Sequence, residues 1–194
     1  MFDALRNYIN NYASSQISEE DFDLVKQAFK HKKIRKRQYF LQEGDVCKYT
    51  AFISKGAMRQ YSVDENGNER IIRLGIENWW MGDFESFVML TPSLYNIDAV
   101  EDSDILMVTN EQMQLLRAQV PAIEATIKVM DQNRAIAYEK RIRASISFSA
   151  EERYLELQKT YPALLQRFPQ TMIASYLGIS PETLSRIRKQ LAVK

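Results

Sequence analysis

The sequence predicts an α+β protein in which an antiparallel β domain lies between N-terminal helices and a long helical C-terminal part. Three observations lead to this prediction. Short β-branched and aromatic runs separated by turn residues fill residues 38–108, a helical period follows from about residue 121 to 146, and two short helical periods joined by one glycine end the chain. With 194 residues, the chain can form one large or two modest domains.

The composition excludes several classes of protein. No apolar run approaches the roughly 18–20 residues of a membrane-spanning helix, and the N-terminus lacks a basic region followed by an apolar one. We therefore expect a soluble cytoplasmic protein with no membrane partner. Cys47 is the single cysteine and His31 the single histidine, which excludes an internal disulfide framework and argues against a metal, cluster or haem centre. We expect no cofactor.

Charge is distributed unevenly along the chain. The segment from Arg134 to Lys194 contains eleven Lys and Arg against five Glu, a net charge of +6, whereas the preceding 133 residues carry −5. A basic C-terminal part favours a polyanionic partner. The alternative is that these charges belong to ordinary solvated helix faces.

The N-terminal segment is expected to form two helices. Residues 2–11 have a helical pattern, and Ser18, followed by three acidic residues, can cap a second helix through Phe22 and Phe29. We expect that helix to end in the basic stretch "HKKIRKR", which would be a solvated helix end beside a strand.

Residues 38–108 are expected to form the β domain. Its strand-like runs are "YFLQEGD", "YTAFISKGAMRQYSV", "NERIIRLG" and "DILMV". Between "MRQYSV" and "ERIIRL" lies "DENGN", in which Asn-Gly tolerates the positive φ of a tight hairpin. This spacing predicts an antiparallel sandwich or barrel.

A long helix is expected from about Pro121 to Ile146. About 25 helical residues would span about 38 Å, which is longer than most helices that only cover a core. We interpret its apolar stripe as a dimer interface, although packing of the first turns against the β domain is an equal alternative. The expected interface residues are Ile123, Ile127, Met130, Arg134 and Ala137.

The C-terminal part is expected to begin with a new helix. Ser149 and Glu152 form a capping-box pattern, and Tyr161-Pro162 stops the helix that follows. Residues 147–149 are therefore a candidate hinge. The domain division that we expect is 1–120 for the β domain with its N-terminal helices, 121–147 for the long helix and 148–194 for the terminal module.

The stretch "QTMIASYLGISPETLSRIRKQL" predicts a helix-turn-helix. Gly178 allows the tight turn, and Pro181 suits the first position of the second helix. Leu184, Ile187 and Leu191 face inward, which leaves the polar side free to enter a DNA major groove of roughly 12 Å width.

The polar side of this second helix carries suitable chemistry for DNA. Arg186 can donate two hydrogen bonds to guanine, Glu182 can accept from cytosine, and Arg188 and Lys189 suit phosphates. The alternative for Glu182 is that the helix dipole favours an acid at this position. The alternative for Arg188 and Lys189 is that they are ordinary cations near the end of a helix. The full set of expected DNA-binding residues is Thr171, Ser180, Pro181, Glu182, Thr183, Ser185, Arg186, Arg188 and Lys189.

The order of these parts resembles the Crp/Fnr family of bacterial transcription regulators over nearly the whole chain. "IASYLGISPETLSRIRKQL" is similar to the family's DNA-reading motif, in which Glu182, Thr183 and Arg186 occupy the base- and phosphate-contacting places. The resemblance implies a jelly-roll-like β-roll, a long dimerisation helix and a winged helix-turn-helix, with double-stranded DNA, a second copy and RNA polymerase as partners. Pro181 stands where many members have a basic residue, which puts the family's best-known DNA site in doubt.

The stretch "GDFESF" resembles the first half of the family's phosphate-binding cassette. Gly82 and Asp83 match it loosely, but Ile97 and Asp98 stand where an arginine and a hydroxyl residue are expected. A cyclic phosphate would meet an anion there, so we expect no response to cyclic AMP. An unknown small-molecule effector is a further expected partner, although core packing is the alternative for the aromatic residues. The expected effector pocket comprises Trp80, Gly82, Asp83, Phe84, Tyr95 and Asp98.

Two other functions compete with a dimeric regulator that binds a near-palindromic site. A cupin-like enzyme would use a similar β-roll to hold a metal, but it needs two or three histidines and the chain has one. No nucleophile with a histidine base can be named, so we do not expect an enzyme. The remaining alternative is a dimeric sensor or scaffold whose terminal helices bind protein.

Overall fold

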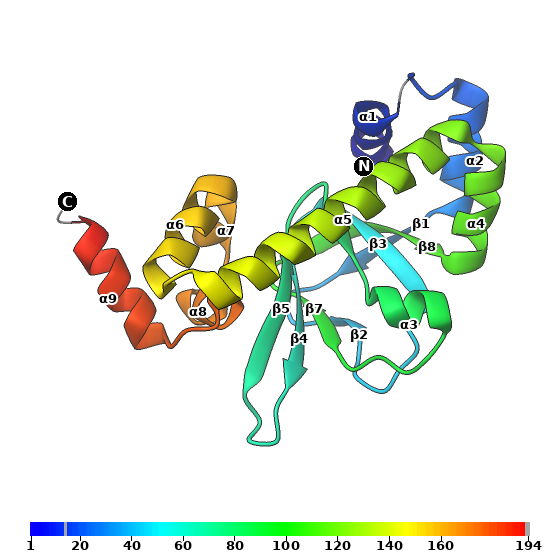
Figure 1. Cartoon of the computed structure of the whole chain (residues 1–194). Helices are drawn as coiled ribbons and strands as arrows, with labels where there is room; N and C mark the ends of the chain where they lie inside the picture. Colours follow the sequence, from blue (N-terminus) through cyan, green and yellow to red (C-terminus); the bar gives the residue numbers. More distant parts are fainter. Residues whose placement is uncertain (14, 193–194) are drawn as a thin grey trace.

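The structure, a computed structural model, describes residues 1–13 and 15–192. A β domain lies beneath one long helix, with the N-terminal helices at one end and the C-terminal helices at the other (Figure 1). In chain order the described elements are α1 (Phe2–Tyr12), α2 (Glu19–Ala28), β1 (Lys30–Ile34), β2 (Tyr39–Leu41), β3 (Tyr49–Lys55), β4 (Met58–Val63), β5 (Glu69–Gly75), β6 (Trp80–Met81), α3 (Phe84–Met89), β7 (Asn96–Ala99), β8 (Ser103–Thr109), α4 (Asn110–Gln119), α5 (Pro121–Ser147), α6 (Ala150–Thr160), α7 (Pro162–Arg167), α8 (Gln170–Leu177) and α9 (Pro181–Ala192).

Two four-stranded antiparallel sheets form the β domain, which confirms the predicted antiparallel architecture. Their strand orders are β1-β8-β3-β6 and β2-β7-β4-β5. The apolar side chains between the sheets include Ile53, Met58, Ile97 and Ile105, each fully buried. Burial of these large side chains contributes roughly 1.5–3 kcal/mol each, which fixes the pairing of the two sheets.

The first strand was not predicted, and the second helix is shorter than expected. The helix ends at Ala28, and Lys30–Ile34 pairs with β8 as an edge strand. Of this strand only Ile34 is buried, while His31 Nε2 lies 2.8 Å from Asp104 Oδ1 on the neighbouring strand. Because "KHKKI" lacks alternating apolar residues, its periodicity does not reveal a strand. Its charges keep an exposed edge from pairing with another chain.

The predicted hairpin is present between β4 and β5. Asp64 Oδ1 accepts hydrogen bonds from the backbone N–H groups of Asn66 at 3.0 Å and Asn68 at 2.9 Å. Gly67 has a φ of 78° and donates its N–H to the Asp64 carbonyl at 2.8 Å. An Asx-type turn of this kind fixes the register of both strands.

A second core lies between one sheet and the N-terminal helices. Phe52 and Leu106 of that sheet contact the buried side chains of α1, α2 and α4. The two N-terminal helices form as predicted, and Ser18 Oγ caps the second by accepting the Asp21 N–H at 3.1 Å. The first turns of α5 complete this core through Ile123, which is 4% exposed.

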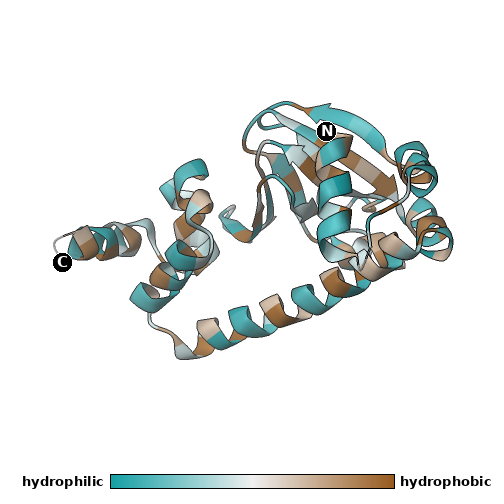
Figure 2. Cartoon of the chain, turned by 90° about the horizontal axis from the view of Figure 1, so that it is seen from above, coloured by the Kyte–Doolittle hydropathy of each residue, from teal (hydrophilic) through white to brown (hydrophobic). Residues whose placement is uncertain are grey.

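A third core joins the C-terminal helices to the other sheet. Ile71 and Leu74 of β5 pack with Tyr154, Leu164 and Ile173 of the helices, and all five are buried. The C-terminal module is therefore docked on the β domain and does not hang from α5 alone. Seen from above, α5 runs along one side of the molecule towards the C-terminal helices (Figure 2).

The long helix and the capping box agree with the sequence. The observed α5 has 27 residues and begins at Pro121, and Ser149 with Glu152 forms the reciprocal cap of α6. The predicted wing is not seen, because every element that the structure describes from residue 150 to 192 is helical. Among the described residues, no helix is both long and apolar enough to cross a membrane.

Candidate nucleic-acid interface and effector cavity

The α8–α9 pair forms a helix-turn-helix through a glycine turn. Gly178 ends α8 with a φ of 68°, the left-handed conformation that glycine adopts without a Cβ penalty. The Ile179 N–H then donates to the Ala174 carbonyl at 3.0 Å, which satisfies one of the last carbonyls of α8. Ser180 Oγ accepts the Thr183 N–H at 3.2 Å and caps α9.

The apolar face of α9 points into the protein and its charged face points to solvent. Leu184 and Ile187 are 1% and 5% exposed, and Leu191 is half-buried against the third core. A shallow hollow runs along the opposite face. Its lining residues are Pro181, Glu182, Ser185, Arg186, Lys189 and Gln190.

Five of the nine predicted DNA-binding residues line this hollow, namely Pro181, Glu182, Ser185, Arg186 and Lys189, whereas Thr171, Ser180, Thr183 and Arg188 do not. The exposed members are Thr171, Ser180, Pro181, Glu182, Arg186, Arg188 and Lys189, and the half-buried members are Thr183 and Ser185. Because α9 lies at the end of the molecule away from the N-terminal helices, no other described element covers this face (Figure 1). The face can therefore approach a large flat or grooved partner.

The electrostatics of α9 favour an anionic partner. Arg186, Arg188 and Lys189 have no ion-pair partner among residues 1–13 and 15–192. The pKa of Glu182 is lowered by its own backbone N–H and by the Ser180 hydroxyl, so this acid is ionised at the helix N-terminus. Glu182 therefore already complements the positive end of the α9 dipole. The cations Arg186, Arg188 and Lys189 are free to contact phosphates or base edges.

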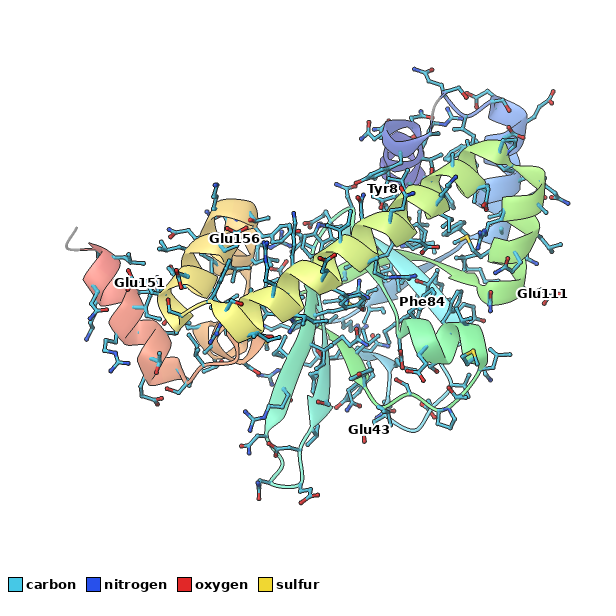
Figure 3. The ribbon with its side chains drawn as sticks, in the orientation of Figure 1. Tyr8, Glu43, Phe84, Glu111, Glu151 and Glu156 are labelled. Carbon is cyan, nitrogen blue, oxygen red and sulfur yellow. The ribbon has the colours of Figure 1, made fainter. Side chains whose placement is uncertain are left out.

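A cavity of about 1670 Å³ lies between α5, the β domain and α8. Of the expected effector-pocket residues, Trp80, Gly82, Asp83 and Phe84 line it. Figure 3 marks Phe84 at the start of α3 and Tyr8 on α1, which contribute to two parts of its wall. The cavity is larger than the roughly 300–1000 Å³ of most small-molecule sites.

The prediction that Tyr95 and Asp98 line this pocket is wrong. Neither is among the cavity-lining residues, because β7 turns Asp98 towards β4. Asp98 is 5% exposed and accepts two hydrogen bonds from Arg59, at 2.8 and 3.0 Å. Arg59 also binds Glu69 and lies over the Tyr61 ring at 4.2 Å. The carboxylate expected to repel a cyclic phosphate is thus neutralised in an ion pair.

Asp83 also has a partner of its own. Its Oδ2 accepts the Ser93 hydroxyl at 2.7 Å, and its side chain is 6% exposed. In addition, Asp83 occupies the N-cap position of α3. This acid holds the loop between α3 and β7, so its carboxylate is already engaged.

Sequence reasoning missed the arginines that line the cavity. Arg73 on β5 donates to the carbonyls of Trp80 at 2.8 Å and Gly82 at 3.5 Å, and Arg141 on α5 donates to the carbonyl of Ile72. Arg73 lies two residues from each of the buried residues Ile71 and Gly75, which is the spacing of one strand face and a weak signal of an inward position. The sequence gives no other indication that β5 and α5 face each other.

The expected dimer residues lie on the side of α5 that faces its own protomer. Ile123 is buried in the second core, Ile127 packs against it, and Met130 and Arg134 line the cavity. Arg134 lies over the Phe84 ring at 3.5 Å, and Ala137, although exposed, also lines the cavity. The structure thus assigns the first of these residues to the core, which corrects the expectation of a dimer contact there. The large exposed apolar residues of α5 are Ile136, Tyr138, Ile142 and Ile146, at 49%, 46%, 60% and 78%, and of these Ile136 and Tyr138 also line the cavity.

No cluster of three or more His, Cys, Asp or Glu side chains among the described residues could hold a metal ion. Cys47 is buried with its thiol directed at the Tyr49 carbonyl at 3.2 Å, and burial raises its pKa. This thiol is therefore protonated and poorly suited to ligate a metal.

Comparison with known proteins gives matches over most of the chain. Residues 31–119 match the family model of the cyclic nucleotide-binding domain. The regulatory protein HlyX of Actinobacillus pleuropneumoniae is 26% identical over 185 residues, which cover 88% of this chain and 75% of that protein. The fumarate and nitrate reduction regulatory protein of Vibrio cholerae is 27% identical over 187 residues, which cover 88% and 72%. The structure of FixK2 from Bradyrhizobium japonicum covers 85% of both chains with a TM-score of 0.69 and 18% identity.

Proposed function

Because the chain belongs to the Crp/Fnr family of transcription regulators, we propose that it binds double-stranded DNA as a homodimer and reads the sequence with α9. The observation that carries this proposal is the free cationic face of a helix whose opposite face is buried. Arg186 at its centre can donate two parallel hydrogen bonds to a guanine.

The position of each side chain on α9 supports a division of roles. Glu182, Ser185, Arg186 and Lys189 line one continuous hollow, which fits contacts to base edges along a major groove. Arg188 lies outside this lining and suits a phosphate. Pro181, the first residue of α9, has neither a hydrogen-bond donor nor a charge. We therefore expect the DNA sequence bound by this protein to differ from the sequences bound by relatives with a basic residue at this position.

Assembly through α5 supports binding to a near-palindromic site. Two copies related by a two-fold axis would place their α9 helices in successive major grooves about 34–36 Å apart. Exposed Ile136, Ile142 and Ile146 are the candidate contacts, because a second α5 would remove them from water.

We do not expect cyclic AMP to act in the manner of the family's phosphate-binding cassette. Asp98 is paired with Arg59, and no guanidinium of β7 is available for a cyclic phosphate. Asp83 is bound to Ser93 and is not free for a ribose hydroxyl. RNA polymerase as a partner, a cytoplasmic location and the absence of an enzymatic activity belong to the same proposal.

A gel-shift assay tests the proposal directly. The wild-type protein and Arg186→Ala would be titrated against genomic fragments, with Arg143→Ala as a control, since Arg143 is exposed on α5 and does not line the hollow. We expect retention by wild type and the control, and a loss of about 1–3 kcal/mol in affinity for the preferred fragment in Arg186→Ala.

The same assay can reject the proposal. Absence of retention at low ionic strength for all three proteins would favour the alternative of a dimeric sensor or scaffold. Retention that does not weaken between roughly 50 and 200 mM salt would also contradict it, because phosphate neutralisation releases counterions.

A further inference from the structure

We propose that Arg167 is a positioning residue for DNA recognition: by binding Glu77 and Glu101 of the β domain, it fixes the orientation of α9 and so the spacing of the two half-sites that a dimer binds. These three residues are called the Arg167 cluster below. The cluster stands on its own contacts, whereas its effect on DNA rests on the proposed function. It lies outside the cavity lining and outside the candidate hinge at residues 147–149.

The covalent connection alone leaves the orientation of the C-terminal module open. α5 ends at Ser147 and α6 begins at Ala150, so only Phe148 and Ser149 join them. Both have an extended backbone, with ψ of 140° and 164°. Rotation about the φ and ψ angles of two such residues can reorient everything that follows them. The observed orientation must therefore come from contacts between the module and the rest of the chain.

The apolar contacts hold the module on the β domain but give it little direction. Ile71 and Leu74 of β5 pack in one core with Ile173 of α8. Hydrophobic burial is non-directional and roughly proportional to area, so a small rotation of the module changes it little. Hydrogen bonds between ionised groups depend strongly on distance and angle. The polar contacts across this boundary are therefore the ones that select one orientation.

Arg167 binds two carboxylates of the β domain at once. Its Nε and Nη2 donate to Glu101 Oε1 and Oε2 at 2.7 and 2.6 Å. Its Nη1 and Nη2 donate to Glu77 Oε2 and Oε1 at 2.9 and 3.2 Å. Two bidentate contacts define the plane of a guanidinium as well as its position. Because Arg167 is the last residue of α7, they also constrain the helix that leads into the helix-turn-helix.

The two carboxylates are themselves held by the β domain. Glu77 Oε1 also accepts the Gly56 N–H at 2.8 Å, in the turn between β3 and β4. The Glu101 N–H donates to the Ala57 carbonyl of the same turn at 3.3 Å. The three side chains of the cluster are 30–36% exposed, so the pairs contribute modestly to stability. Their geometry points to orientation as their main effect.

Ser175 of α8 makes a further polar contact that reports on this orientation. Its Oγ accepts the Ile71 N–H at 2.9 Å and donates to the Glu69 carbonyl at 3.1 Å. Among the described strands, β5 is at the edge of its sheet, so these two backbone groups face the module and not another strand. Exchange of the Ile71 amide hydrogen with solvent therefore measures how firmly the module is held.

The orientation of the module sets the distance between two α9 helices. In a dimer with a two-fold axis, these helices would lie about 34–36 Å apart in successive major grooves. One additional base pair moves the second half-site by about 3.4 Å along the duplex and also turns it around the axis. A module held in one orientation cannot follow this change, but a module that rotates can. The Arg167 cluster would thus determine how strictly the protein distinguishes half-site spacings.

Hydrogen exchange of the full chain, measured by NMR, tests the cluster without DNA. The readout is the exchange rate of the Ile71 amide divided by that of the Val120 amide, which is buried far from the module and donates to the Leu116 carbonyl. A general loss of stability would accelerate both amides, whereas a loosened module accelerates Ile71 alone. We expect Arg167→Gln to raise the ratio at least about threefold.

Two controls accompany this measurement. Arg6→Gln removes a bidentate pair with Glu19 at 2.6 and 2.9 Å among the N-terminal helices, where Arg6 is 27% exposed, and should not raise the ratio. In a Glu77→Gln/Glu101→Gln background, Arg167→Gln should have no further effect, because its partners are already neutral. An unchanged ratio in Arg167→Gln alone, or a full effect in that background, overturns the proposal.

Gel shifts test the role in spacing. The duplexes are a palindromic site selected in vitro with the wild-type protein and the same site with one base pair inserted between its halves. The readout is the ratio of the two affinities, because a smaller folded fraction lowers both affinities equally. We expect this ratio to fall at least about threefold in Arg167→Gln and to stay unchanged in Arg6→Gln. An unchanged ratio in Arg167→Gln overturns the role in spacing.

The two assays separate this inference from the proposed function. Wild type that retains no duplex would contradict the proposed function and the role in spacing, while a raised exchange ratio in Arg167→Gln would still support the cluster. Wild type that retains DNA, with the same exchange ratio as Arg167→Gln, would contradict the cluster alone.

Discussion

At the scale of single residues, the arginines differ in whether their charge is paired with carboxylates of the fold. Arg59 holds Asp98 and Glu69, and Arg167 holds two carboxylates as well. Arg73 and Arg141 donate hydrogen bonds to backbone carbonyls and to no carboxylate among the described residues. A guanidinium between two carboxylates has its charge satisfied within the fold, whereas one held by carbonyls retains a charge for a partner.

The Arg59–Asp98 pair leads to a prediction on stability. Asp98→Asn should reduce the free energy of unfolding by about 2–3 kcal/mol, because both side chains are nearly buried and the amide cannot replace the charge. Urea denaturation followed by circular dichroism measures the change. Glu69→Gln is the control, since Glu69 binds the same arginine from an exposed position and should cost less than about 1 kcal/mol. Equal losses in both variants would contradict this account of burial.

At the scale of elements, two glycine turns, one after β3 and one after α8, illustrate how backbone conformation and close packing act separately. Gly178 and Gly56 both have positive φ, at 68° and 100°. A Cβ at Gly178 would meet nothing within 4 Å, but at Gly56 it would lie 2.2 Å from Ser103 Oγ. The first glycine is needed for its conformation alone, and the second for conformation and space.

This difference gives a second prediction. Gly178→Ala should destabilise the protein by about 1–2 kcal/mol through left-handed strain, while Gly56→Ala should cost clearly more, because the strand β8 must also move. Thermal unfolding of both variants and of wild type provides the comparison. The ranking is the decisive result: a larger loss for Gly178→Ala would show that the turn is constrained by something besides its φ.

The exposed apolar residues of α5 give a third prediction, on assembly. Ile142→Glu should convert the expected dimer to a monomer, because a carboxylate replaces an apolar side chain that is 60% exposed in the single chain. Leu94→Glu is the matched control at an exposed apolar residue of the β domain, 69% exposed, and should leave assembly unchanged. Light scattering coupled to size exclusion gives the mass. A dimer in both variants would remove these α5 residues from the interface.

At the scale of the whole molecule, the C-terminal module is held on the β domain by a core and by polar contacts. Arg167 of α7 binds Glu101 at 2.6 and 2.7 Å and Glu77 at 2.9 and 3.2 Å. Ser175 Oγ accepts the Ile71 N–H at 2.9 Å. These contacts fix the position of α9 relative to α5, which is the quantity that sets the spacing of two α9 helices in a dimer.

The Arg167–Glu77 contact gives a prediction on pH. Burial raises the pKa of Glu77, but hydrogen bonds from Arg167 and from the Gly56 N–H outweigh it, so the pKa lies below its ordinary value of 4.5. A lowered folded-state pKa contributes stability above the unfolded-state value and loses it as the pH falls through the folded-state value. The free energy of unfolding of wild type should therefore exceed that of Glu77→Gln from pH 7 to about pH 5. The difference should be only about 1 kcal/mol, because the Arg167 and Glu77 side chains are about a third exposed, and it should shrink below about pH 4.5.

Urea denaturation at about pH 7, 5 and 3.5, on both sides of the expected transition, measures this difference. Glu43→Gln is the control for the general effect of low pH on stability, because Glu43 is an exposed residue of the β domain away from the C-terminal module. A difference between wild type and Glu77→Gln that grows as the pH falls would have the wrong sign for a carboxylate stabilised by Arg167.

Local patterns in the sequence determined most elements and the DNA-binding candidates. The caps at Ser18 and Ser149, the turn at residues 64–68 and the helix boundaries at Pro121 and Gly178 all depend on neighbouring residues, so they could be predicted without a fold. The outward face of α9 followed from its helical period for the same reason.

Only the tertiary structure decided which faces and charges meet across the chain. The edge strand β1 forms because β8 supplies its partner, and Asp98 leaves the cavity because Arg59 lies opposite it on β4. The side of α5 that faces its own protomer, and the hydrogen bond from Arg141 to the Ile72 carbonyl, depend on how the long helix packs over β5. Periodicity shows that a helix has two faces, but the neighbour of each face is set by contacts between distant residues.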